Sequence, residues 1–219
     1  MAGGEPLKNA PIENLRNTPF SLLTGALDEG FYRNKLTAYT KAALEQTKFV
    51  YRVELLPGYG HHIDYSLTTP WLAQYKRNPT PLHVSWEDFE MDGRYRRGFS
   101  NLVVLERPDT QGRTYYDETI SNNTIDLSVN NVVYTTIEKD TIWGIDLKFQ
   151  KHFTPVKSGK IRIYLSENQI DLKRPVRILV NGQEKFNGRL RPSLKSMAES
   201  LSVFYDPERI FPVYVDITI

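Results

Sequence analysis

Apolar and polar residues in the first part of the chain follow the pattern of a strand, a helix and a second strand. Residues 19–27, PFSLLTGAL, form a short apolar run that ends at a glycine-containing turn, which is typical of a buried strand. Residues 34–46 place Leu36, Tyr39 and Ala43 at helical spacing, with no Pro or Gly between them. Residues 49–56 are apolar again and predict the second strand. This order, within about forty residues, indicates a parallel βαβ unit.

The second part of the chain is dominated by short strand patterns. A short helix at residues 69–75 and a turn-rich connector at residues 78–81 precede it. The strands are rich in Val, Ile, Tyr and Thr and are separated by polar turns. They are expected at residues 101–106, 113–120, 131–137, 144–149 and 160–165. Short strands at this regular spacing predict a β-sandwich of the immunoglobulin-like type.

Three further elements complete the predicted β-domain. Asn181 and Gly182 stand between two strand-like runs and predict a type I′ hairpin, because both turn residues need a positive φ. Residues 193–204 carry apolar side chains at helical spacing, and residues 211–219 form a last strand. The expected fold is therefore α/β plus all-β, with a first domain at residues 1–98 and a β-sandwich domain with one helix at residues 99–219.

Composition narrows the functional class. Of the 219 residues, 40% are hydrophobic and 25% charged, and the formal net charge of +2 lacks the basic excess of a nucleic-acid-binding protein. No apolar run reaches the length of a membrane span. The absence of cysteine excludes disulfides and thiolate metal sites. We expect no cofactor, no nucleic acid and no membrane as partners. The opening MAGGEPLKNAP lacks the features of a signal peptide, and the compartment stays open.

Candidate chemistry lies at the ends of the two predicted parallel strands. Asp28 follows the first strand, and His61 and His62 follow the second, on the glycine-rich stretch LPGYGHHIDY. Parallel strands bring their carboxyl ends to one edge of a sheet, where catalytic groups gather in α/β folds. An aspartate there can accept the imidazole Nδ1–H and leave Nε2 to take a proton. Asp28 and His61 are therefore the candidate catalytic acid and base.

Several stretches resemble a known family of enzymes. NLRNTPFSLLTGALDEGFYRNK, GYGHHIDY and WLAQYKRNPTP resemble the last part of the catalytic domain of bacterial α/β-hydrolases, namely polyhydroxybutyrate-depolymerase-like esterases and prolyl-oligopeptidase-like peptidases. Residues 160–219 resemble the β-domain often attached to them, and Bacteroidetes members look closest. The resemblance implies that Asp28 is the triad acid and His61 the base, ahead of His62. It also implies an ester or peptide substrate, and relatives of this kind are often exported.

The chain departs from that family at the nucleophile. No G-x-S-x-G motif is present, and the nearest string, GFSNL at residues 98–102, lacks the last glycine and follows the histidine. The opening MAGG resembles an internal segment of these enzymes. We therefore expect a C-terminal fragment that cannot complete a triad alone, with the open edge of its first strand free for self-association. If the chain does hold its own nucleophile, Ser66 and Ser100 are the first candidates.

A second hypothesis is a non-catalytic β-sandwich that binds a polymer or a partner chain. The remaining chemistry-bearing residues favour structural roles. Trp71, Trp86 and Trp143 are expected to pack, and His83 and His152 are isolated in sequence. The acidic stretch SWEDFEMD at residues 85–92 is expected to be a solvated connector rather than a cation site, locally paired with the basic RYRR at residues 94–97.

Overall fold

The computed structural model describes residues 4–66, 68–90, 93–110 and 112–219. Strands are its main regular secondary structure, and helices are few. The chain separates into two compact units. The first comprises Met1–Arg77 with Tyr134–His152, and the second comprises Asn78–Val133 with Phe153–Ile219. The expected domains, 1–98 and 99–219, differ from these units, because residues 78–98 belong with the second unit and residues 134–152 with the first.

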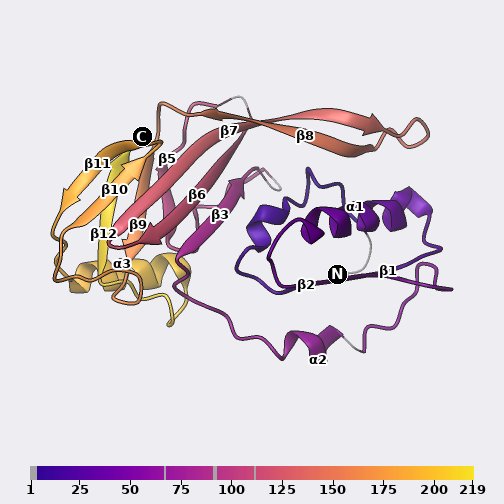
Figure 1. The fold of residues 1–219 in the computed structure, drawn as a ribbon, viewed down its shortest axis with the longest axis horizontal. Coiled ribbons are helices and arrows are strands. Elements are labelled where there is room, and N and C mark those ends of the chain that lie inside the picture. The colour runs from indigo at the N-terminus through magenta and orange to yellow at the C-terminus, as the bar shows by residue number, and fades with distance from the viewer. Residues whose placement is uncertain (1–3, 67, 91–92, 111) are drawn as a thin grey trace. The chain divides into compact units, whose positions relative to one another are not determined.

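The first unit is built on the predicted strand, helix and strand (Figure 1). Strand β1 (Phe20–Gly25) pairs in parallel with β2 (Tyr51–Leu56), and helix α1 (Arg33–Glu45) connects them. Leu22, Leu44 and Val53 form the centre of its core, one from each of the three elements. Short helices complete the unit: η1 (Ile12–Leu15), η2 (Gly30–Tyr32) and α2 (Thr68–Leu72). The pattern-based prediction of a parallel βαβ unit is confirmed.

A long hairpin supplies the rest of the first unit. Strands β7 (Thr124–Lys139) and β8 (Asp146–Pro155) pair with each other, and their outer part, residues 134–152, contacts α1. Glu138 receives hydrogen bonds from the Lys35 ammonium at 2.5 Å and the Tyr39 hydroxyl at 2.8 Å. Lys151 binds the Glu13 carboxylate at 2.7 Å. Polar contacts therefore fix the hairpin against α1 and η1.

The second unit consists of two sheets around one core. One sheet has the order β11-β10-β7-β6-β3, with β8 beside β7, and the other has the order β12-β9-β5-β4. Both contribute apolar side chains to a common cluster that includes Trp86, Leu127 and Ile163. The pairing of β10 with β7 is parallel, so the larger sheet is mixed. The new elements are β3 (His83–Asp88), β4 (Gly98–Phe99), β5 (Leu102–Glu106), β6 (Arg113–Ser121), β9 (Lys160–Leu165), β10 (Val176–Val180), β11 (Gln183–Gly188), α3 (Leu194–Phe204) and β12 (Val213–Thr218).

The hairpin turn lies where the sequence predicts it, and a serine caps the last helix. Asn181 and Gly182 link β10 to β11 with φ values of 48° and 77°, as a type I′ turn requires. The Asn181 amide also accepts a hydrogen bond from the Val129 main chain at 2.8 Å. Ser193 caps α3, because its hydroxyl accepts a hydrogen bond from the Ser196 N–H at 3.1 Å. None of the helices in the described ranges is long and apolar enough to cross a membrane.

The prediction of a solvated connector at residues 85–92 is wrong for residues 85–88, because these residues belong to strand β3. Trp86 is buried in the core, where its ring stacks on Tyr116 with centroids 5.0 Å apart. Glu87 and Asp88 are also buried and form ion pairs with Arg113 and Arg107, and Arg96 of the RYRR cluster also acts to lower the pKa of Asp88 although burial raises it. Distant arginines thus make an acidic strand stable inside the fold. Residues 91 and 92 lie outside the described residues.

Candidate active site

The ends of two strands, and a glycine that leaves room between them, bring the candidate acid and base together. Asp28 follows β1, and His61 follows β2 on the loop after Leu56. The loop passes directly over Gly25, where a Cβ atom would lie 2.0 Å from the Gly60 carbonyl oxygen. Real Cβ atoms essentially never come so close, so only glycine permits this approach. The main chain locks the loop in place, since the Leu27 N–H donates to the Tyr59 carbonyl at 2.9 Å.

The structure joins Asp28 to His61 by a side-chain hydrogen bond. The Nδ1 atom of His61 lies 3.0 Å from Oδ2 of Asp28. The Asp28 side chain is only 6% exposed, whereas the His61 side chain is 63% exposed. His62 is exposed, and its ring lies edge-on to that of His61 with centroids 5.8 Å apart. With Nδ1 turned to the carboxylate, Nε2 is the His61 atom that can exchange a proton with a substrate group.

Arg33 is a third member of this arrangement that the sequence analysis missed. Its Nε atom lies 3.1 and 3.0 Å from the two Asp28 oxygens, and its Nη2 atom lies 2.9 Å from Oδ1. The Arg33 guanidinium is the largest influence on the pKa of Asp28, and with a smaller contribution from His61 it lowers that pKa although burial acts to raise it. Asp28 is therefore ionised at neutral pH. The signal in the sequence was an arginine five positions after the aspartate, at the start of a helix.

The backbone between Asp28 and Arg33 takes an uncommon path. Phe31 and Tyr32 have φ values of 51° and 58°, which side-chain-bearing residues adopt at a cost of about 1 kcal/mol or more each. This reversal precedes α1 and turns Arg33 back onto Asp28. The Tyr32 hydroxyl donates to Asp140, which helps to hold the strained segment.

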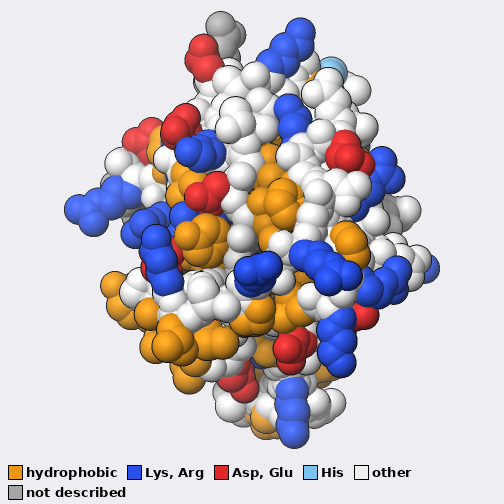
Figure 2. All heavy atoms as spheres, turned by 90° about the vertical axis from the view of Figure 1, so that its left-hand side faces the viewer, with side chains coloured by type: hydrophobic (Ala, Val, Ile, Leu, Met, Phe, Trp, Pro, Cys, Tyr) orange, Lys and Arg blue, Asp and Glu red, His pale blue; other side chains and the backbone are white. Residues whose placement is uncertain are grey.

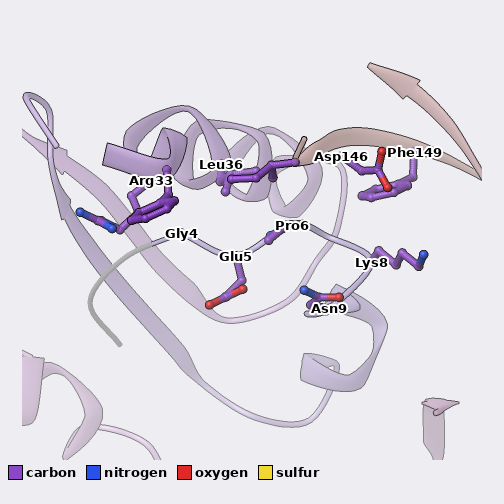
Figure 3. A pocket seen from close by; sticks show the side chains of 11 residues that line it. Gly4, Glu5, Pro6, Lys8, Asn9, Arg33, Leu36, Asp146 and Phe149 are labelled. Carbon is purple, nitrogen blue, oxygen red and sulfur yellow. The ribbon is translucent and has the colours of Figure 1, made fainter. Parts of the chain in front are cut away.

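A cavity of about 510 Å³ adjoins this arrangement through Arg33 (Figure 3). The N-terminal segment at residues 4–9, the start of α1 and residues 145–149 line it. Its wall mixes apolar groups, such as Leu36 and Phe149, with charged groups, such as Glu5 and Asp146. Phe31 also lines the cavity, and its ring contacts that of Trp143 with centroids 4.9 Å apart. Trp143 was expected to pack, and it does so against Phe31 although it is more than half exposed.

Neither serine named as a candidate nucleophile fits that role. Ser66 donates its hydroxyl to Asp64 at 2.9 Å, in an exposed loop. Ser100 lies in the second unit, where Ser100 and Asn101 form the turn between β4 and β5. Its φ of 58° is left-handed, but the surrounding elements are two antiparallel strands, not the strand and helix of a nucleophile elbow. The string GFSNL is therefore a hairpin turn.

The second unit contains a histidine–aspartate pair of its own. Nε2 of His83 lies 3.0 Å from Oδ1 of Asp117, which also accepts hydrogen bonds from Ser85 at 2.6 Å and Tyr115 at 3.3 Å. These residues stand side by side on β3 and β6, where Ser85 is the register partner of Asp117. His83 thus takes part in a polar network of the sheet and is less isolated than its sequence surroundings suggest.

Glu118 is the second ionisable group that the sequence analysis missed. It is fully buried on β6, and burial raises its pKa to about 7 although the Asn101 amide acts against this. Nδ2 of Asn101 lies 2.9 Å from Oε2 of Glu118 and also donates to the Tyr164 carbonyl at 3.1 Å. The alternation of inward and outward side chains along β6 gave a signal of this burial, since Glu118 lies on the same face as the core residues Tyr116 and Ile120.

Comparisons of the chain with protein-family models, with curated proteins and with solved structures found no match. Within the described residues, no group of three or more His, Asp or Glu side chains is placed to hold a metal ion.

Proposed function

We propose that Asp28 and His61 are the acid and base of a serine α/β-hydrolase that cleaves ester or peptide bonds. The observation that carries this proposal is the 3.0 Å contact between Oδ2 of the buried Asp28 and Nδ1 of the exposed His61, at the carboxyl ends of adjacent parallel strands. This geometry fixes the tautomer in which Nε2 is unprotonated and can accept the proton of an attacking hydroxyl. The resulting imidazolium would then donate that proton to the leaving group.

The nucleophile in this proposal comes from outside the 219 residues. The sequence holds no G-x-S-x-G motif, Ser66 donates its hydroxyl to Asp64, and Ser100 lies in a hairpin turn of the second unit. Of the strands in the described part of the chain, only β2 pairs with β1, so the other edge of β1 is open to a further strand. In an α/β-hydrolase that edge would continue into the sheet that carries the serine. The second unit would then be the immunoglobulin-like accessory domain.

Arg33 bears on the role of Asp28 in this proposal. Its guanidinium forms an ion pair with the Asp28 carboxylate. In the proposed mechanism Asp28 mainly orients the imidazole, and Arg33 keeps Asp28 ionised and in place. Arg33 is thus a positioning residue.

The test has two parts. The first is the genomic sequence before Met1, which we expect to encode a G-x-S-x-G motif, in frame or behind one frameshift. The second is hydrolysis of p-nitrophenyl esters by the purified chain, which should not exceed the rate of a histidine alone, because loss of the serine costs a triad about 10⁶ in kcat. Substantial turnover by the chain that disappears in His61→Ala would contradict an external nucleophile. Absence of any encoded serine motif would contradict the hydrolase assignment.

A further inference from the structure

Helix α3 exposes large apolar side chains and buries small polar ones. Leu194 is 84% exposed and Tyr205, its C-cap, is 88% exposed. Leu201 and Ala198 are exposed on the same helix. Figure 2, which looks onto the side of the second unit that carries α3, shows hydrophobic side chains gathered on its lower part. We call residues 194, 198, 201 and 205 the outer stripe of α3.

The inner face of α3 packs and hydrogen-bonds against the rest of the second unit without using these residues. Ser196 and Ser200 are buried, and both are hydrogen-bonded to the segment that leads into β12. The Ser196 hydroxyl donates to the Phe211 carbonyl at 2.9 Å, and the Phe211 N–H donates to the Ser200 hydroxyl at 2.9 Å. Phe204 packs on Tyr164 and Phe211. The orientation of the helix is therefore fixed, and the outer stripe is a property of the folded unit.

The spacing of the outer stripe fits another helix. Leu194, Ala198 and Leu201 are separated by four and three positions, the repeat that keeps one seam of a helix facing a partner helix, and Tyr205 follows at the C-cap in a left-handed conformation. Scattered exposed apolar residues are normal, but a contiguous stripe on one helix marks an interaction surface.

The pattern of the stripe is complementary to itself. In an antiparallel pair of α3 helices, Leu194 of one copy would face Tyr205 of the other, and Ala198 would face Leu201. A small side chain thus meets a large one, and a two-fold axis repeats each contact. In a parallel pair, Ala198 would face Ala198 and leave a gap. The stripe therefore fits a second copy of this chain in the antiparallel orientation.

The charges near the helix ends agree with this orientation. Arg191 and Lys195 are exposed at the N-terminal end of α3, and Glu208 is exposed beyond its C-terminal end. An antiparallel pair would bring Arg191 near Glu208 of the second copy, whereas a parallel pair would bring like charges together. Opposed helix dipoles add a small favourable contribution.

We propose that this chain forms a homodimer in which the outer stripe of α3 packs antiparallel against the same stripe of a second copy. The contact is small for a protein interface, so the dimer is weak, with a Kd on the order of micromolar. The proposal concerns the second unit and is independent of the catalytic role proposed for Asp28 and His61.

Sedimentation of the full chain over a range of about 1–500 µM tests the proposal. We expect a concentration-dependent monomer–dimer equilibrium that Leu194→Lys combined with Tyr205→Asn weakens at least tenfold. Both positions are exposed, and asparagine tolerates the left-handed φ of 51° at residue 205, so the fold should be retained. Ile142→Lys, at an equally exposed apolar position outside the stripe, is the matched control and should dimerise as the native chain does.

Two results would overturn the proposal. The first is a monomer at every concentration. The second is a double variant that dimerises like the native chain, which would place the association elsewhere, for example at the open edge of β1.

Charge reversal then tests the orientation. For an antiparallel pair, Arg191→Glu and Glu208→Arg should each weaken the homodimer, and an equimolar mixture of the two variants should restore native affinity. For a parallel pair, the single variants would match the native chain and the mixture would exceed it. That second pattern would overturn the antiparallel arrangement.

Discussion

Each of the two units joins an aspartate to a histidine at 3.0 Å, but the two pairs use different ring nitrogens. In the first unit Nδ1 of His61 meets Asp28, so the outer atom Nε2 remains for proton transfer. In the second unit the outer atom, Nε2 of His83, is the one that meets Asp117. The first pair stands on loops after strand ends, and the second lies within paired strands. The contact distance alone therefore does not identify a catalytic pair.

The units also treat their buried carboxylates in opposite ways. Asp28 lies against the Arg33 guanidinium, which lowers its pKa. Glu118 has the neutral Asn101 amide as its hydrogen-bond donor, and burial raises its pKa. Both side chains are almost fully inaccessible to solvent. A cationic partner offsets the effect of burial on the pKa of Asp28 but not on that of Asp88, whose pKa is raised although Arg107 is its ion-pair partner.

The largest expected effect separates the two histidine–aspartate pairs by activity. In the proposed hydrolase, with its serine present, Asp28→Asn should lower kcat by about 10⁴, because the wrong imidazole tautomer is then favoured. His61→Ala should abolish ester hydrolysis, whereas His62→Ala should leave most of it. His83→Ala is the matched control in the second unit and should keep native turnover. A dead His62→Ala enzyme would show that the choice of base is wrong, although the site would stand.

A smaller effect should distinguish the Glu118 carboxylate from the Asp28 carboxylate by the pH dependence of stability. Glu118 ionises near 4.5 when unfolded but near 7 when folded, so the folded state holds more protons within that window. The free energy of unfolding should therefore fall as pH rises from 4.5 to 7, by about 3 kcal/mol, and then level off. Glu118→Gln should remove this decline, as measured by urea unfolding at a series of pH values. Glu167→Gln, an exposed position, is the control, and a native-like slope in Glu118→Gln would contradict the assignment.

The next effect concerns the ion pair of the first unit. Arg33→Met leaves Asp28 buried with a single partner, so the variant should lose roughly 2 kcal/mol of stability at pH 7, less than a fully buried pair because Arg33 is partly exposed. Because the pKa of Asp28 is lowered in the native fold, the contribution of Asp28 to stability is present above its unfolded pKa and is lost as the pH falls. Arg177→Met, which breaks the exposed pair with Glu184, should cost under about 1 kcal/mol. If urea unfolding showed equal losses of stability in Arg33→Met and Arg177→Met, the expected difference between the two ion pairs would be refuted.

The most subtle difference is the imidazole tautomer. At a pH where both rings are neutral, long-range ¹⁵N–¹H correlation spectra should show His61 protonated at Nδ1 and His83 at Nε2, since each donates to its aspartate. The same tautomer in both residues would remove the distinction on which the comparison rests.

Much of the architecture near the site could be predicted from local patterns. The order of apolar runs around one amphipathic helix predicts parallel strands, and parallel strands place Asp28 and His61 at one edge. Strand β3 could not be found in this way, because its carboxylates predict a solvent-exposed segment. They are buried because Arg107 and Arg113, from later parts of the chain, form ion pairs with them. A charge pattern shows which groups are present but not which distant groups neutralise them.

The candidate site shows the same division. Sequence order alone predicted that the acid and base would meet, because the strands impose it. The contact of Arg33 with both Asp28 oxygens depends on the left-handed turn at Phe31 and Tyr32. Aromatic residues rarely adopt this conformation, so the sequence gives no sign of it. In the second unit, the burial of Glu118 follows from the register between β6 and its neighbours, which the alternation of one strand only suggests.

The close passage of the 57–61 loop over Gly25 has a genetic consequence. Every other amino acid carries a Cβ atom, so any missense change of this codon inserts an atom into a space that main-chain carbonyls already fill. Such an allele would keep both Asp28 and His61 in its protein but would force them apart. In a screen for inactive alleles, codon 25 should therefore appear together with codons 28 and 61, although its product contributes no functional group to the chemistry.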